Sequence, residues 1–217
     1  MKLAIQIVLW LVAGVLVYLI YDSINGPIKF NKLKEERYAK VIERMKDIRD
    51  AELAYKDVTG RFTGSFDELI AFIDTAQFTI TQRRDTTVLD VEMTKAYGVD
   101  QYKELVLIDT LGYRSVKDSL FKESESYREM MWVPTTNKTE KFELDAGFIT
   151  KSNNKIPVFE AKVAKEVILK DQPQELVMQE KQIVSADAVN GEYIRVGSME
   201  EIDTNGNWPS FYEGAKK

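Results

Sequence analysis

Residues 3–21 of the chain read LAIQIVLWLVAGVLVYLIY, which is 19 residues without a charged side chain. A helix of this length is about 28 Å long at 1.5 Å rise per residue, close to the hydrocarbon thickness of a bilayer. Aromatic rings are typical of membrane-spanning helices where they meet the interface. The run therefore predicts a transmembrane anchor over residues 1–22, with anchoring residues Leu3, Trp10, Tyr18 and Tyr21.

Two other structures share this pattern, a cleavable signal peptide and a buried helix of a soluble protein. The apolar run is longer than the roughly 7 to 15 residues of a signal-peptide core. The residues that follow it, YDSINGP at 21–27, offer no small-x-small cleavage site. We therefore expect the segment to stay attached to the chain.

The charges that flank the run leave its orientation open. Lys2 lies on the N-terminal side, whereas five Lys and Arg residues lie between positions 29 and 40. A strict positive-inside count would keep the folded part in the cytoplasm, but long domains translocate largely regardless of charge.

Composition excludes several kinds of chemistry. The 217 residues include no Cys and no His, and the formal net charge is −5. The chain therefore cannot form a disulfide, a thiolate or imidazole zinc site, or a Ser-His-Asp triad. An acidic chain is a poor match for nucleic acid, because phosphate binding depends on clustered Lys and Arg. We expect no nucleic acid partner, no small-molecule substrate and no enzymatic activity.

The next segment predicts a long amphipathic helix. Gly26-Pro27 should break or kink the helix that leaves the bilayer, so residues 23–29 form a kinked linker and a new helix begins near Phe30. From there to about Val58, apolar residues recur at three-to-four spacing. The predicted packing face consists of Tyr38, Val41, Met45, Ile48 and Tyr55. Two interpretations stay open, docking on the chain's own β-domain and packing in an intermolecular helical bundle.

A β-rich domain is predicted after this helix. The capping-box pattern Ser65-Phe-Asp-Glu68 starts a short helix at 66–74, within a helical region over 30–76. From residue 77 the period changes to that of a strand. Strands are predicted at 78–81, 88–93, 104–109, 127–133, 142–150, 158–163, 167–169, 183–184 and 193–196, with connections at 82–87 and 153–155. The predicted fold class is α+β, with the long helix packed on one antiparallel β-rich domain over 77–217.

Residues 45–69 read MKDIRDAELAYKDVTGRFTGSFDEL, and they resemble the post-membrane region of type IV pilins and type II secretion pseudopilins. The shared pattern is an amphipathic helix with Ile, Ala and Tyr on its buried side, then a Gly-aromatic turn, then Ser-x-x-Glu-Leu. Pilins carry a glutamate inside the apolar run, whereas Gln6 is the only polar residue here. The resemblance therefore implies pilin-like topology, an inner-membrane anchor that presents a periplasmic domain.

Three short motifs resemble the O-glycosylation sites of Bacteroidota envelope proteins. They are Asp85-Thr-Thr, Asp109-Thr-Leu and Asp118-Ser-Leu, so the candidate modified residues are Thr86, Thr110 and Ser119. Together with the tail NGNWPSFYE at 205–213, these motifs make the chain similar to Bacteroidota membrane proteins. The alternative is that they are ordinary strand ends and turns.

The segment most typical of a ligand site runs from Asp203 to Trp208. Its alternating Asp203, Asn205 and Asn207 can offer side-chain oxygens to Ca²⁺, which takes six to eight oxygen ligands. The glycine is misplaced for an EF-hand, and the alternative is a tight Asn-Gly turn that presents Trp208. Apart from these candidate Ca²⁺ ligands, we expect no cofactor.

These patterns lead to a functional hypothesis. We expect a single-span inner-membrane protein with a periplasmic C-terminal domain, which acts as a scaffold or accessory subunit of a membrane-associated complex. Its partners would be the lipid bilayer and other envelope proteins. The alternatives are a pseudopilin-like subunit of a secretion or pilus apparatus and a cytoplasmic-facing membrane adaptor.

Overall fold

The computed structural model describes residues 2–214 and combines helices with antiparallel sheets, as the α+β prediction requires. In chain order the elements are α1 (Lys2–Thr59), α2 (Phe66–Thr75), β1 (Gln77–Leu89), α3 (Val91–Tyr97), β2 (Tyr102–Ser115), α4 (Val116–Leu120), η1 (Ser126–Glu129), β3 (Glu143–Lys151), β4 (Asn154–Ala164), α5 (Lys165–Ile168), α6 (Gln174–Lys181), β5 (Tyr193–Gly197) and η2 (Ser210–Tyr212). They divide into two compact units. The first unit combines the chain up to Phe66 with the chain from Arg128 onward, and the second is Asp67–Tyr127.

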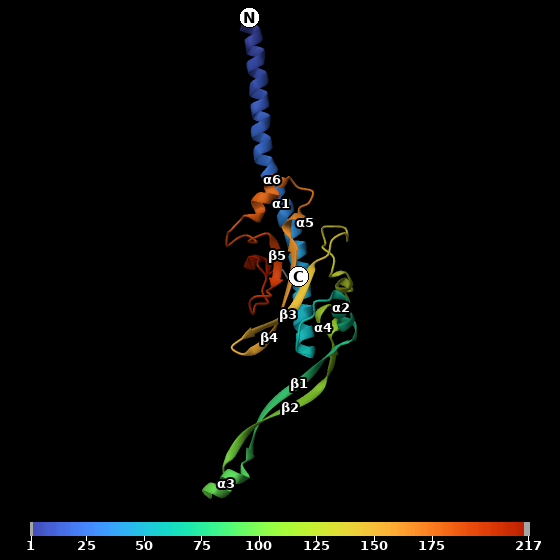
Figure 1. The fold of residues 1–217 in the computed structure, drawn as a ribbon, viewed down its shortest axis with the longest axis vertical. Helices are drawn as coiled ribbons and strands as arrows, with labels where there is room; N and C mark the ends of the chain where they lie inside the picture. The colour runs from blue at the N-terminus through green and yellow to red at the C-terminus, as the bar shows by residue number, and fades with distance from the viewer. Residues whose placement is uncertain (1, 215–217) are drawn as a thin grey trace. The chain divides into compact units, whose positions relative to one another are not determined.

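A single helix, α1, connects the apolar N-terminal run with the folded part of the first unit (Figure 1). The predicted break at Gly26-Pro27 and the new helix near Phe30 are wrong, because α1 runs through residues 23–29 without interruption. Proline in a helix removes one backbone hydrogen bond at a cost of about 3 kcal/mol, which the turns on both sides can offset. The Asn25 side-chain amide also donates a hydrogen bond to the Tyr21 carbonyl oxygen at 2.9 Å, in the turn before the proline.

The C-terminal half of α1 lies in the core of the first unit. The predicted packing face is buried throughout, at Tyr38, Val41, Met45, Ile48 and Tyr55. The helix packs against β5. Alternate residues of β4 and β5 are buried in turn, as expected for strands with one covered face: Phe159, Ala161, Val163, Ile194 and Val196. The structure therefore places the packing face inside the chain's own core.

The sheet of the first unit has the strand order β3–β4–β5, and both pairs are antiparallel. Ser152 and Asn153 join β3 to β4 with positive φ angles of 51° and 65°. Two residues of this conformation form a type I′ turn, which matches the right-handed twist of the strands. This turn lies beside the connection predicted at 153–155.

The second unit carries a long antiparallel ribbon of β1 and β2, paired from Gln77 with Ser115 to Leu89 with Tyr102. At its far end the Asp90 carboxylate accepts hydrogen bonds from the backbone N–H groups of Glu92 and Met93 in α3, and Gly98 ends that helix at a φ of 71°. These two caps explain why residues 91–93 form a helix where the sequence predicts a strand.

The predicted connection at 82–87 is also wrong, because these residues form the middle of β1. They read QRRDTT and contain no Gly, Pro or Asn, so Asp85 is the one residue among them that favours a tight turn. Polar side chains marked this stretch as a loop, but they suit equally a strand of an exposed ribbon. The chain reverses instead between Asp90 and Gln101, through α3.

Three further predicted strands are not strands in the structure. Residues 127–133 contain η1 and an isolated bridge at Trp132, and their buried side chains recur every three positions, the spacing of a 3₁₀ turn. Residues 167 and 168 lie in α5, and Val184 is 89% exposed outside any strand. The predicted single β-rich domain over 77–217 is divided as well, because residues 77–127 belong to the second unit.

A substitution at Ile48 can test whether this face of α1 forms the core, because the Ile48 side chain is fully buried. Ile48→Asp places an unpaired carboxylate among apolar side chains and should lower the free energy of unfolding by about 3 kcal/mol or more. The control is Val58→Asp in the exposed last turn of α1, which should change it by less than about 1 kcal/mol. Denaturant unfolding of the full chain in mild detergent measures both, and an unchanged midpoint for Ile48→Asp would contradict this core.

Candidate functional site

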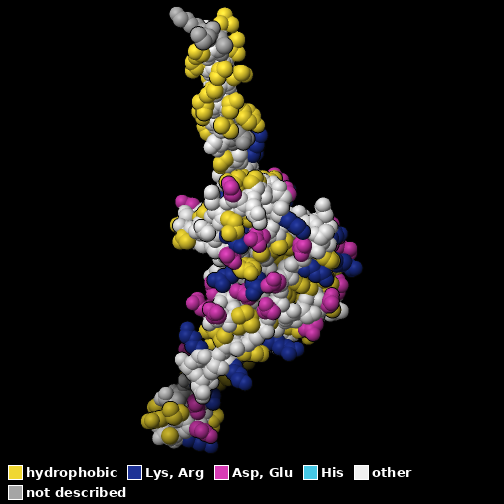
Figure 2. Space-filling model, turned by 45° about the horizontal axis from the view of Figure 1, so that its top comes forward, with side chains coloured by type: hydrophobic (Ala, Val, Ile, Leu, Met, Phe, Trp, Pro, Cys, Tyr) yellow, Lys and Arg dark blue, Asp and Glu magenta, His cyan; other side chains and the backbone are white. Residues whose placement is uncertain are grey.

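The N-terminal part of α1 exposes apolar side chains around its circumference. Six successive residues at positions 7–12 are each more than half exposed. Since successive helical residues point about 100° apart, their exposure covers every side of the helix. Figure 2 shows hydrophobic side chains along this part of the chain. Soluble proteins rarely expose apolar surface on this scale, so the segment is a candidate for burial in an apolar environment.

Among residues 2–214, α1 is the one helix long and apolar enough to cross a membrane. The predicted anchoring residues Leu3, Trp10, Tyr18 and Tyr21 are all exposed on it. The chain therefore has a single N-terminal candidate for a membrane span, in agreement with the coarse prediction from the sequence.

The candidate glycosylation residues lie in the second unit. Thr86 is half-buried in β1, and Thr110 is exposed in β2. Ser119 is half-buried in α4, where its hydroxyl donates a hydrogen bond to the Ser115 carbonyl oxygen at 2.9 Å. Of the three residues, Thr110 is the most exposed.

The candidate Ca²⁺ ligands lie in the loop after β5, and their side chains are used within the protein. An Asp203 carboxylate oxygen accepts hydrogen bonds from the backbone N–H and the side-chain amide of Asn205, at 2.9 and 2.8 Å. The Asn207 side chain accepts from the Arg195 N–H at 3.0 Å and donates to the Tyr193 carbonyl oxygen at 2.8 Å. No cluster of three or more acidic side chains within residues 2–214 is arranged to hold a metal. These bonds hold the loop against β5, and Trp208 is buried.

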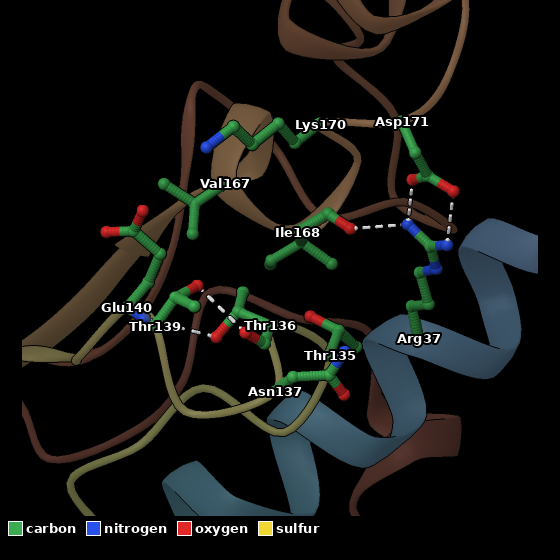
Figure 3. Close-up of a pocket in the computed structure, with 10 residues that line it drawn as sticks. All are labelled: Arg37, Thr135, Thr136, Asn137, Thr139, Glu140, Val167, Ile168, Lys170 and Asp171. Carbon is green, nitrogen blue, oxygen red and sulfur yellow. Dashed lines mark hydrogen bonds and ion pairs between the residues drawn. The ribbon is translucent and has the colours of Figure 1, made fainter.

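A polar cleft of about 490 Å³ lies in the first unit, between α1, the loop at 135–140 and α5 (Figure 3). Arg37 of α1 binds Asp171 through two hydrogen bonds and the Ile168 carbonyl oxygen at 2.8 Å. The hydrogen bond from Arg37 lowers the pKa of Asp171 to about 2. The lining residues are Arg37, Thr135, Thr136, Asn137, Thr139, Glu140, Val167, Ile168, Lys170 and Asp171.

Several polar groups of this cleft already have partners inside the protein. The Thr136 and Thr139 hydroxyls donate to carbonyl oxygens of their own loop, at 3.0 and 2.8 Å. The Thr135 hydroxyl oxygen is buried without a hydrogen-bond partner. The two carboxylates of the lining are Glu140 and Asp171, and Asp171 is bound by Arg37.

A buried ion cluster that sequence reasoning missed joins α1, α5 and α6. Lys165 is fully buried, and its Nζ donates to the carbonyl oxygens of Glu180 at 2.8 Å and Val189 at 2.7 Å. The Glu180 carboxylate lies 3.3 Å from Lys165 Nζ and 2.8 Å from Lys34 Nζ, and accepts the Tyr38 hydroxyl at 3.3 Å. Burial lowers the pKa of Lys165 and raises that of Tyr38.

The sequence contains a signal for this cluster. Residues 159, 161 and 163 of β4 are buried in alternation, and the same period places Lys165 at the next buried position. A lysine at such a position needs a buried partner of opposite charge. Identifying the partner as Glu180 requires the structure, because 15 residues separate the two in the chain.

A second buried acid, Glu52, lies on α1. Its side chain is fully buried, and one carboxylate oxygen accepts the Thr63 backbone N–H at 3.1 Å while the other has no hydrogen-bond partner. Burial raises the pKa of this carboxyl to about 8, against the opposite effect of the Thr63 hydrogen bond. Glu52 is therefore mostly protonated at neutral pH.

No protein-family model, curated protein or solved structure matches this chain.

The buried ion cluster predicts that neutralising Glu180 lowers the free energy of unfolding far more than neutralising Glu166. Glu180→Gln leaves Lys165 buried without its counter-charge and should lower the free energy of unfolding by about 3–5 kcal/mol. The matched control is Glu166→Gln, because Glu166 is exposed and binds Lys181 at 2.8 Å. Because the Glu166 carboxylate is exposed, its pairing contributes less than about 1 kcal/mol, and this variant should resemble the wild type in denaturant unfolding. Equal losses in the two variants would contradict the role given to Glu180.

The raised pKa of Glu52 predicts a pH-dependent stability. The carboxyl has an ordinary pKa of 4.5 in the unfolded chain and about 8 in the folded protein, so the folded protein binds the proton more tightly. Its contribution is fully present below about pH 4.5 and is lost as the pH rises to about 8, by an amount on the order of 4 kcal/mol. Glu52→Gln has no proton to lose and should flatten this part of the profile.

Denaturant unfolding at pH 5 and pH 8 measures this effect. Glu43→Gln, at an exposed position of α1, is the control and should keep the wild-type slope. Parallel profiles for the wild type and Glu52→Gln would mean that Glu52 ionises normally in the folded protein.

Proposed function

We propose that the chain is a single-span envelope protein, anchored in the inner membrane by the N-terminal part of α1. Its folded units act as a scaffold or accessory subunit of a membrane-associated complex. The function proposed is therefore binding and positioning.

This proposal rests on one observation, that the N-terminal part of α1 is exposed and apolar whereas its C-terminal part packs in the core of the first unit. The run at 3–21 of α1 is charge-free and its large apolar side chains are exposed, whereas the part from Tyr38 to Tyr55 buries one face in the first unit. A helix with this division can insert its first part in lipid while its second part organises a folded unit outside it. The anchor and the folded unit are then one continuous element.

The second unit supports a role in assembly. Its ribbon and α3 expose large apolar side chains, among them Met93, Tyr97, Ile108 and Tyr113. Figure 2 shows hydrophobic side chains gathered at the far end of the ribbon. Exposed apolar surface of this kind marks protein-binding sites on native proteins.

The alternative, a pseudopilin-like subunit of a secretion or pilus apparatus, has one specific argument in its favour. A long helix with an exposed apolar first half and a second half packed on an antiparallel sheet is the layout that the resemblance of residues 45–69 implies. That resemblance, with the glycosylation-like motifs, also favours a periplasmic position of the folded units over a cytoplasmic one. In a pilin-like subunit the leader would be removed and the apolar helices would pack together.

The anchor is tested by extraction of the full chain from membranes. We expect it to resist alkaline carbonate, to be released by detergent, and to have the intact mass of 25.0 kDa. In mild detergent it should co-purify with other envelope proteins in fixed ratio. The variant Val12→Asp/Leu16→Asp is the control, because each acid at the centre of the span costs about 2.5–3.5 kcal/mol and should make the chain extractable.

Three results would count against the proposal. Release of the wild type by carbonate would contradict the anchor, and loss of about 20 to 30 residues would identify a cleaved leader. Recovery of the chain without any other protein would contradict the role of an accessory subunit.

A further inference from the structure

The β1–β2 ribbon of the second unit has an unpaired edge on its more apolar strand. Within the described residues β2 pairs with β1 alone, so the backbone groups on the other side of β2 have no strand to bind. Residues 105–108 of β2 read LVLI, and these four side chains are 40%, 45%, 41% and 67% exposed. Both faces and one edge of this strand are therefore uncovered.

The composition of the two strands indicates which one should be central in a sheet. A continuous apolar run is typical of an interior strand of a sheet whose faces are covered, and edge strands carry charged side chains that prevent further pairing. β2 has the first pattern at 105–108, and β1 has the second at 82–87. A two-stranded ribbon alone is also marginally stable in water. β2 thus has the sequence of a central strand with one neighbour missing.

We propose that the missing neighbour is β2 of a second copy of this chain, paired antiparallel about a two-fold axis at Val106. In this register Leu105 faces Leu107 of the second copy, and Lys103 faces its Asp109. Because the axis repeats every contact, each copy contributes one Lys103 and one Asp109, so two opposite-charge pairs form. The product is a four-stranded sheet in the order β1–β2–β2–β1, with the polar β1 strands at both edges.

Charge pairing favours this register over registers shifted by one or two residues. A shift by one residue in one direction sets Glu104 against Asp109 of the second copy, and the other shifts by one or two residues remove the pairing of Lys103 with Asp109. Like charges directly opposite destabilise a sheet, and opposite charges stabilise it. Lys103 and Asp109 are about half exposed, at 58% and 48%.

The contacts within the chain are compatible with this pairing. Asp109 binds Arg84 across the ribbon, but a carboxylate accepts several hydrogen bonds and can also receive Lys103 of the second copy. Lys103 lies 3.8 Å from Asp90, a loose contact that leaves its ammonium free to turn. This inference goes beyond the proposed function and does not require the membrane anchor.

Cysteine cross-linking of the full chain tests the proposal, because the protein has no Cys of its own. Val106→Cys places two thiols on the symmetry axis, where directly opposite residues lie within reach of a disulfide. The matched control is Ile108→Cys on the same strand face, which is more exposed. The two Ile108 positions would be offset by four residues, about 13 Å along the strands, and a disulfide needs Cα atoms within about 7 Å.

We expect mild oxidation in detergent to convert Val106→Cys to a covalent dimer at least tenfold faster than Ile108→Cys. Equal rates would mean random collision, and absence of dimer in both variants would mean that β2 stays unpaired or binds something else. Either outcome would overturn the proposal.

Amide hydrogen exchange of the unmodified protein gives a second measurement. In the four-stranded sheet all four amides at 105–108 are paired, so all should be protected at high protein concentration. On dilution, every second amide should lose protection as the copies separate. Alternate amides that exchange rapidly at every concentration would rule out the dimer.

Discussion

The burial of one side of α1 between Tyr38 and Tyr55 is the interaction on which the first unit depends. Each large apolar side chain that this face buries contributes about 1.5–3 kcal/mol relative to exposure. The alternating buried residues of β4 and β5 belong to the same core. The type I′ turn at Ser152-Asn153 sets the pairing of β3 with β4. The apolar run at 3–21 contributes nothing to this core, so the helix is free to place that run in a different environment.

Buried charges give the apolar core a defined alignment. Apolar contact alone tolerates sliding of one helix along another, whereas the bonds of Lys165 and Lys34 to Glu180 are satisfied in one arrangement of α1, α5 and α6. Such a cluster adds little net stability, since desolvation of the ions offsets their attraction. We interpret it as a device for specificity. Glu52 differs because it is protonated at neutral pH and avoids the cost of a buried charge.

Much of the helical structure could be predicted from the sequence, and so could the position of a strand within each of β1 to β5, but the full length and the pairing of the strands could not. The three-to-four spacing from Tyr38 to Tyr55 identified the buried face because a helix of this length repeats the signal many times. The continuity of α1 at Pro27 was missed, since local propensity cannot weigh one lost hydrogen bond against two long flanking helical segments. The middle of β1 was missed because polar residues at 82–87 resemble a loop until their partner strand is known. The ion cluster required a contact between residues far apart in the chain, which no local pattern encodes.

The continuity of α1 also has a mechanical consequence. No loop separates the apolar run from the packed half, so the 58-residue helix, about 87 Å long, joins the first unit's sheet to the proposed span without a hinge. Membrane-spanning helices tilt by about 20° on average, and the tilt changes with the thickness of the bilayer. In a thinner membrane the helix would lean further, and the sheet would lean with it. Bilayer thickness would then set the angle at which the first unit meets its partners.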